Sequence, residues 1–510
     1  FQMSSGIKEG VLYPQWESLS NGGYGSPTTI FYSPLFYWIT GVVNLIIPSL
    51  ATSLKITIFS GFFLSGLMMY LFLRNFCGHA GSVIGGIAYQ LLPYTIFDFY
   101  IRETLAEVFG LFWLPLIFHF AYKAAAKDRF YYWIGLSFSY SGLILTHIAS
   151  AYIFTFVMAF AALFLSMKES RPRILLNMVL AGIFGLSLSA FYFIPMFFER
   201  KFVHIEWVTE FVNYTHAFLY LAETRQNPFY IQLHQIVMLQ GLLVIVSLIL
   251  AYYRYKSYHD RANQHYIVAF SLLFAFSLFI STPLSMPIWK IIPGLSTTQF
   301  PWRWLMVSTF ATSILTALTV DSFSLYDIKN YRFIRICKAA FYAVLFANFY
   351  FSSAYIMAAR PVEKRDMERI IRDGVLIEYR PIWLTDKKKD FSQEPWIPVV
   401  FKEGKGAIEV LDWKSQSRAF RVDAALPSLL RVSTFYYPGW TALNNGREIP
   451  IGIEKNSGAM LINIPPGKNE VLLEFRDTPL RRGAKWISVV SLLAAFIGLI
   501  AAKRNRMALF

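Results

Sequence analysis

Apolar runs of about 20 residues recur along this chain, with short polar segments between them. About 20 apolar residues in helical form are needed to cross the core of a lipid bilayer. The pattern therefore predicts an α-helical, polytopic membrane protein. We expect eleven spans, at 52–73, 80–97, 104–122, 131–146, 149–167, 174–197, 234–254, 265–281, 303–320, 335–357 and 483–501.

The composition agrees with this prediction. Of 510 residues, 55% are hydrophobic and only 15% are charged, whereas soluble domains average about 25% charged residues. The net charge of +16 does not indicate a nucleic-acid partner, because the Lys and Arg lie between hydrophobic runs, as the charges of cytoplasmic loops do. Cys77 and Cys337 fall in no metal or redox motif, so we expect no disulfide framework.

The basic residues predict which side of the membrane each loop occupies. If the span 52–73 runs from outside to inside, seventeen Lys and Arg lie at the inside segments and six at the outside ones. The positive-inside rule favours this orientation. The outer side then holds 1–51, 358–482 and the loops 98–103, 147–148, 198–233 and 282–302.

The apolar stretch 31–49 contains Pro34, Gly41 and Pro48. We interpret it as a juxtamembrane or re-entrant helix. A twelfth span is the alternative, but it would invert every later loop and break the charge rule.

Residues 358–482 differ from the rest because they are polar and contain alternating runs, such as 407–411 and 471–475. Turn signals separate these runs, and alternation between turns predicts antiparallel strands. We expect a small extracytoplasmic β-sandwich there. The predicted parts are a first extracytoplasmic loop with juxtamembrane helices, a helical membrane domain, the β-rich domain, and a last span with a cytoplasmic tail: 1–51, 52–357, 358–482 and 483–510.

Charged residues beside membrane helices are functional candidates by default, because charge is costly there. Asp98, Arg102 and Glu103 lie at the outer ends of two predicted helices, and Glu103 and Glu107 share one helix face. Two carboxylates on one face can hold a metal ion or act as a general base. The alternative is a structural ion pair of Arg102 with Glu103 or Asp98.

Two further candidates lie at outer helix ends. His147 occupies the tip of a helical hairpin, although a lone His is more often structural than catalytic. Arg303 follows Gln299-Phe-Pro-Trp and begins a span. Its planar guanidinium suits bidentate binding of a phosphate, and the alternative is an Arg that snorkels to the membrane surface.

Residues 1–38 are rich in Gly, Pro and aromatic side chains. We expect Trp16, Tyr24 and Tyr32 to offer flat faces to sugars or isoprenoids. An ordinary interfacial aromatic segment is the alternative. The chain contains no Gly-x-Ser-x-Gly elbow, P-loop or His-Glu-x-x-His motif, so a donor reached from outside is not a cytosolic nucleotide sugar.

A series of short motifs runs along the chain: Glu9-Gly10 to Tyr13-Pro14-x-Trp16, Asn21-Gly-Gly-Tyr-Gly25, Phe31-Tyr-Ser-Pro34-Leu-Phe-Tyr37, Tyr100-x-Arg102-x-x-x-x-Glu107, Thr146-His147, Gln299-Phe-Pro-Trp-Arg303, Glu378-Tyr379-x-Pro381 and Tyr436-Tyr-Pro-Gly-Trp440. Their order resembles that in GT-C type membrane glycosyltransferases. The group labelled 6-pyruvoyl-tetrahydropterin synthase-related membrane proteins and its YfhO-like relatives are most similar. The resemblance extends over essentially the whole chain.

The resemblance implies an inverting transfer of a sugar from a polyprenyl-phosphate donor on the outer face. In the family, an acidic residue after the first span acts as base or metal anchor. The chain begins at Phe1, and we expect that span and its Asp to be missing before it. Glu103 is a second departure, because relatives often have Gly there. No cofactor is certain, and a divalent Mg or Mn ion is compatible with the family.

We therefore predict a GT-C-like glycosyltransferase of the plasma membrane. Its partners would be membrane lipid, a polyprenyl-phosphate sugar, and a glycan or lipid acceptor. Arg102 and Arg303 would stabilise the leaving phosphate, and Tyr100 and Gln299 would contact substrate. The candidates for orienting the acceptor or a metal are Glu9, Asp98, Glu103 and Glu107.

Two rival functions stay open. A flippase or transporter of lipid-linked sugars would need polar residues deep inside several spans. A non-catalytic membrane protein would instead use the β-domain to bind glycan.

Overall fold

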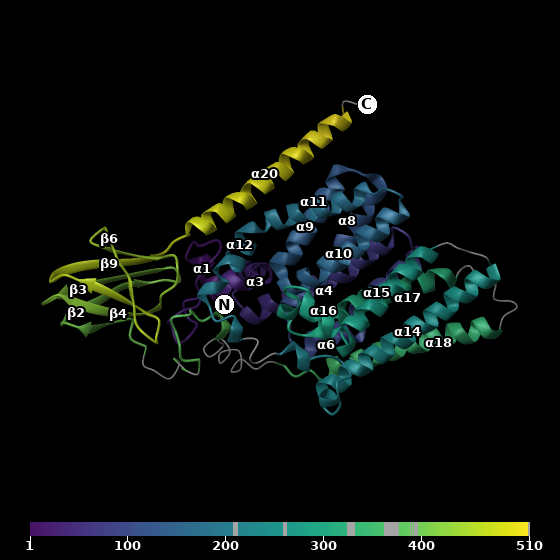
Figure 1. Ribbon diagram of the computed structural model, residues 1–510, viewed down its shortest axis with the longest axis horizontal. Helices are drawn as coiled ribbons and strands as arrows, with labels where there is room; N and C mark the ends of the chain where they lie inside the picture. Colours follow the sequence, from purple (N-terminus) through teal and green to yellow (C-terminus); the bar gives the residue numbers. More distant parts are fainter. Residues whose placement is uncertain are drawn as a thin grey trace. The chain divides into compact units, whose positions relative to one another are not determined.

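The computed structural model describes residues 1–207, 213–258, 263–323, 332–361, 377–387, 389, 391 and 396–507 (Figure 1). The chain divides into two compact units, each assembled from separate stretches of sequence. The first unit contains Phe1–Thr57, Ser187–Phe211 and Pro361–Leu492. The second unit contains Ile58–Leu186, Val212–Arg360 and Leu493–Phe510.

The second unit is helical. Its helices, some of which extend beyond it, are α4 (Leu50–Leu73), α5 (His79–Leu91), α6 (Pro93–Tyr100), α7 (Leu105–Gly110), α8 (Trp113–Lys127), α9 (Phe130–Thr146), α10 (Ile148–Lys168), α11 (Arg173–Leu188), α14 (Pro228–Tyr258), α15 (Gln264–Ile280), α16 (Met286–Ile291), α17 (Leu305–Ser322) and α18 (Arg332–Ala358). Short 3₁₀ helices η5 (Leu295–Thr298) and η6 (Pro301–Trp304) precede α17.

Helix α17 forms the centre of this unit, and nearly all of its residues are buried. Small residues allow its close approach to α5: a Cβ atom on Gly85 would lie only 2.7 Å from the Cβ of Ala317. Small residues at such contacts are typical of helices that pack inside membranes.

Among the described residues, seven helices are long and apolar enough to cross a membrane, or up to nine if each of two bent pairs forms one span. This number is lower than the eleven spans that the sequence predicts. The run 80–97 is divided by the extended Leu92 before Pro93, and α9, at 17 residues, is just shorter than a full span.

The first unit contains the β-strands, which are drawn in green to yellow and all lie between Val399 and Phe475 of the sequence (Figure 1). One sheet has the order β1-β4-β8-β7 and the other β2-β3-β9-β5-β6. Every described pairing is antiparallel. The strands are β1 (Val399–Glu403), β2 (Gly406–Trp413), β3 (Ser417–Ala424), β4 (Ser428–Phe435), β5 (Trp440–Asn444), β6 (Arg447–Ile449), β7 (Gly452–Ile453), β8 (Ala459–Ile464) and β9 (Gly467–Phe475).

The core of the two sheets follows from their alternating pattern. Buried residues such as Phe420 in β3, Leu430 in β4 and Val471 in β9 belong to one hydrophobic cluster. Because both sheets contribute to that cluster, the arrangement is a β-sandwich, as expected. It lies before α20 (Pro479–Met507), the last helix.

The β-sandwich is joined in its unit by the first residues of the chain. Helices α1 (Gln2–Lys8), α2 (Thr28–Phe31) and α3 (Leu35–Ile46) belong here, as does α12 (Ala190–Glu199). Helix α3 has only 12 residues, or about 18 Å at the usual rise. This length supports a juxtamembrane or re-entrant helix rather than a twelfth span.

Candidate functional site

Charged side chains from three separate segments meet in the second unit. Asp98 lies in the last turn of α6, Arg102 in the loop that follows, and Glu107 in α7. The Arg102 guanidinium forms an ion pair with Asp98 through Nη1 and with Glu107 Oε2 through Nη2, at 3.2 Å. Its side chain is only 5% exposed, so one buried cation links two buried carboxylates.

The loop conformation brings these groups together. Thr104 Oγ1 donates to Asp98 Oδ1 at 2.7 Å, which closes the loop onto the end of α6. Glu103 has a φ of +54°, in the left-handed region that favours glycine. A residue with a side chain is therefore strained at this position.

Arg303, in η6, approaches Glu107 from a segment almost 200 residues further along the chain. Its Nε lies 3.6 Å from Glu107 Oε2, the same oxygen that Arg102 contacts. Its Nη1 donates to the carbonyl of Thr298 at 2.6 Å and to Gln299 Oε1 at 3.3 Å. Among the described residues, Nη2 forms no hydrogen bond, so this edge of the guanidinium is available to an anion.

His147 completes the cluster. Its Nε2 lies 4.0 Å from Glu107 Oε2, and its Nδ1 accepts a hydrogen bond from the Ser150 backbone N–H at 3.3 Å. Burial lowers the pKa of His147 to about 4, so the ring is neutral at pH 7 and carries its proton on Nε2. The catalytic role that we expect for His147 stays a prediction, since the ring lies near Glu107 but forms no hydrogen bond with it.

Burial also affects Asp98. It raises the pKa of this carboxyl, while Arg102 acts in the opposite direction. Its Oδ2 is buried and has no hydrogen-bond partner in the described part of the chain, and the same holds for Glu107 Oε1. Unsatisfied buried oxygens are costly in a purely structural cluster, and their presence is typical of a functional site.

These groups do not fit a divalent metal ion. Two guanidinium groups already balance the two carboxylates, and both approach the same oxygen of Glu107. Across the residues that the structure describes, no group of three or more His, Cys, Asp or Glu side chains could hold an ion.

The sequence singled out five members of this cluster: Asp98, Arg102, Glu107, His147 and Arg303. The alternative of an ion pair between Arg102 and Asp98 is also present, as part of the larger network. Gln299 is a direct partner of Arg303. By contrast, Glu103 is exposed beside the cluster, and the ring of Tyr100 packs on Phe99, with centroids 4.6 Å apart.

Three contributors to the cluster were not predicted. Tyr94 OH accepts a hydrogen bond from Arg102 at 3.3 Å. The Trp302 ring lies 4.5 Å from the Arg102 guanidinium carbon, close enough for a cation–π contact. Thr104 holds Asp98. Trp302 could have been predicted from its place next to Arg303 in the sequence. The contacts of Tyr94 and Thr104 could not, because they depend on how the loop folds.

The four candidates from the first segment belong to the other unit and pack within it. Trp16 is 1% exposed and lies in the β-sandwich core. Tyr24 OH accepts from Arg431 at 2.8 Å, Glu9 accepts from the Ser415 backbone N–H at 2.8 Å, and Tyr32 meets Tyr37 edge-on. We expected the aromatic faces to be open to substrate, but the β-sandwich covers Trp16 and Tyr24.

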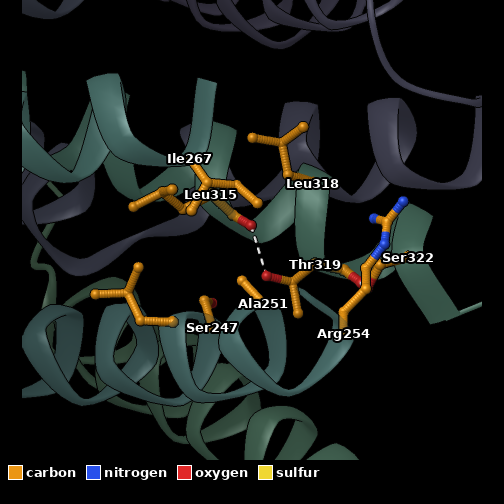
Figure 2. Close-up of a pocket in the computed structure, with 9 residues that line it drawn as sticks. Ser247, Ala251, Arg254, Ile267, Leu315, Leu318, Thr319 and Ser322 are labelled. Carbon is orange, nitrogen blue, oxygen red and sulfur yellow. Dashed lines mark hydrogen bonds between the residues drawn. The ribbon is translucent and has the colours of Figure 1, made fainter. Parts of the chain in front are cut away.

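The opposite end of α17 contains a small pocket that Figure 2 shows in close-up. Arg254 and Ser247 come from α14, and Thr319 donates to the Leu315 carbonyl at 2.8 Å. The free volume of about 10 Å³ is the size needed for one water molecule. This pocket offers no room for a lipid-linked sugar, so it does not support the transporter alternative.

Comparisons with known proteins assign no family. No family model matches the chain. An uncharacterised protein of Lactococcus lactis subsp. cremoris (strain MG1363) is 24% identical over 207 residues, which are 39% of this chain and 34% of that protein. The match thus spans about a third of the relative's length.

A solved structure is also similar in part. It is the apo crystal structure of the Archaeoglobus fulgidus oligosaccharyltransferase, with a TM-score of 0.39 and 12% identity. The match covers 78% of this chain and 56% of that one. A likeness at this level does not assign an activity.

Proposed function

We propose that the chain is a GT-C-like membrane glycosyltransferase that moves a sugar from a polyprenyl-phosphate donor to an extracytoplasmic glycan, lipid or cell-wall acceptor. The observation that carries this proposal is the shared contact of Arg102 and Arg303 with one oxygen of Glu107. Two guanidinium groups fixed beside each other at the ends of apolar helices suit a lipid phosphate. The order of the sequence motifs supports the same function.

In the proposed reaction, the acceptor hydroxyl oxygen bonds to the anomeric carbon while the bond from that carbon to the donor phosphate breaks. Negative charge develops on the departing phosphate, and Arg303 and Arg102 stabilise it electrostatically. Glu107 holds both guanidinium groups in place through its Oε2 atom.

The hydroxyl proton passes to a carboxylate, and this part of the chain offers two candidates. Asp98 has a pKa raised by burial and an oxygen without a hydrogen bond among the described residues, which suits a general base. Glu103 is exposed and has no ion pair among the described residues.

The decisive experiment measures sugar transfer from radiolabelled undecaprenyl-phosphate glucose and mannose in membranes that contain the full-length protein. We expect Arg303→Gln and Glu107→Gln to lower transfer by roughly 100-fold to 1,000-fold, the usual effect of losing one electrostatic stabiliser. Arg225→Gln is the matched control, because Arg225 is an exposed cation outside the cluster, and it should retain activity. Full transfer by both cluster variants would exclude the proposal.

A second pair of variants separates the two candidate bases. Glu103→Gly relieves a left-handed backbone, so we expect it to raise stability by about 0.5–1 kcal/mol and to keep transfer within about threefold. Asp98→Asn should lower transfer by roughly 100-fold. The opposite ranking would make Glu103 the base. Binding of the labelled donor without transfer by any form of the full-length protein would favour the non-catalytic alternative.

A further inference from the structure

A second polar site lies where α8 and α10 end and where α11 begins. These segments do not contribute to the charged cluster around Glu107. The site is a pocket of about 550 Å³ between the end of α8 and the turn that joins α10 to α11. Its polar lining consists of Lys127, Asp128, Ser170, Arg171, Arg173 and Asn177. All of these belong to the second unit, so one compact body builds the pocket.

The charge of this pocket is unbalanced. Lys127, Arg171 and Arg173 are exposed, and their charged groups form no ion pair or hydrogen bond with the described residues. Asp128 is the only acidic residue in the lining that the structure describes, and the Trp133 indole donates to it at 3.2 Å. The nearby Lys168, by contrast, is neutralised by Glu169 at 2.6 Å. The pocket therefore keeps a net positive charge.

Apolar side chains continue from the pocket along the same two helices. On α11, Leu176, Val179 and Leu180 are each more than half exposed, and on α10 Leu163 and Met167 are too. Both helices are apolar enough to lie in a membrane, α11 as part of a bent pair. A cationic pocket thus lies next to a surface suited to acyl chains.

We propose that this pocket binds the phosphate headgroup of an anionic phospholipid. Basic pockets between membrane helices attract such headgroups, and each Lys or Arg near an anionic surface adds to the affinity. The guanidinium groups of Arg171 and Arg173 can pair with phosphate oxygens in a bidentate manner. A free phosphate has the same charge but gains nothing from the exposed apolar side chains, so we assign the site to a lipid. The positive-inside rule places it on the cytoplasmic side.

The test is native mass spectrometry of the full-length protein, released from nanodiscs of equimolar dioleoylphosphatidylglycerol and dioleoylphosphatidylcholine. We expect the protein to retain phosphatidylglycerol preferentially. The triple variant Lys127→Gln, Arg171→Gln, Arg173→Gln should lower this preference by roughly tenfold to a hundredfold. A matched variant, Arg332→Gln, Lys503→Gln, Arg504→Gln, removes three exposed cations from other helix ends and should stay within about twofold.

Two outcomes would overturn the proposal. One is an equal loss of preference, or none, in both triple variants. The other is displacement of phosphatidylglycerol by millimolar inorganic phosphate, which would indicate a site for the free ion. Cross-linking of the wild-type protein with a photoactivatable phosphatidylglycerol does not depend on how the variants fold. We expect labelled peptides from 125–128 and 170–177, and labelling confined to other helices would contradict the assignment.

Discussion

Each unit contains a buried cluster of arginine and carboxylate groups, and the two clusters differ in how completely they are paired. In the first unit, Arg481 binds Glu199 with two nitrogens, at 2.9 and 2.7 Å, and Tyr437 OH donates to the same carboxylate at 3.1 Å. Both oxygens of Glu199 are satisfied. In the second unit, one oxygen of Glu107 and one of Asp98 have no hydrogen-bond partner among the described residues.

We interpret this difference as a structural role for the first cluster and as support for the proposed functional role of the second. The ion pair of Glu199 with Arg481 connects α12 to the start of α20, within a unit whose core is the β-sandwich. Its unpaired atom is Nη1 of Arg481. Among the described residues, the cluster around Glu107 instead leaves two carboxylate oxygens unpaired, as a site built for a ligand does. Variants can test this contrast directly.

The largest loss of stability should follow from breaking the ion pair of Glu199 with Arg481. Glu199→Ala leaves the Arg481 charge buried and without its counter-ion, so we expect the free energy of unfolding to fall by about 3–5 kcal/mol. Thermal unfolding of the detergent-solubilised protein measures this. Glu206→Ala serves as the control, because the Glu206 side chain is 60% exposed. Equal destabilisation by both variants would show that the buried ion pair is no more important for stability than an exposed one, and would contradict the contrast between the clusters.

A smaller loss of stability should follow from a change in how residues 1–38 pack. Gly25 has a φ of +86°, and a Cβ atom there would lie 2.2 Å from the Trp16 indole nitrogen. We expect Gly25→Ala to destabilise the protein by about 2 kcal/mol. Gly446→Ala imposes a similar backbone strain at φ +77° but meets no atom within 4 Å. The difference between the two melting temperatures therefore reports the contact with Trp16.

The cluster around Glu107 should tolerate loss of its charges better than the ion pair of Glu199 with Arg481. The double variant Glu107→Leu, Arg303→Leu removes one charge of each sign and leaves Arg102 paired with Asp98. We expect stability within about 1 kcal/mol of the wild type, because apolar residues often replace a buried ion pair without loss, while transfer disappears. A destabilisation as large as that of Glu199→Ala would contradict the contrast between the clusters.

The smallest effect concerns acid stability of the β-sandwich. Burial acts to raise the pKa of Glu454, but Lys402, Ser457 and Arg431 lower it to about 2. Its contribution is complete above the unfolded pKa near 4.5 and is lost as pH falls from 4.5 to 2. After discounting for solvent screening we expect about 1 kcal/mol. Glu454→Gln should therefore flatten the plot of unfolding free energy against pH in this range. An unchanged slope would show that other carboxylates determine the acid stability.

The sequence predicted the helical class, the β-sandwich and five members of the charged cluster, for different reasons. Helices and strands are local, so hydropathy and alternation indicate them. Asp98, Arg102, Glu107, His147 and Arg303 were found because charges at the ends of apolar helices have few purely structural uses. Their contacts could not be predicted, since they depend on a left-handed turn at Glu103 and on packing between distant segments.

The first segment shows where such reasoning fails. An aromatic residue next to Gly can face a substrate or a protein core, and composition does not distinguish the two. Trp16 and Tyr24 pack with β-strands more than 400 residues away, which no local pattern could indicate. Likewise, Leu92 before Pro93 interrupted a run that hydropathy alone treats as continuous.

The assembly of the first unit from three distant stretches has a consequence for biosynthesis. Residues 1–57 leave the ribosome long before the strands that cover Trp16 and Tyr24. At the usual elongation rate of about 5–20 residues per second, the delay is roughly 20–90 seconds. During that time these aromatic rings lack their final neighbours, so the core of the first unit forms only after the β-sandwich has been synthesised.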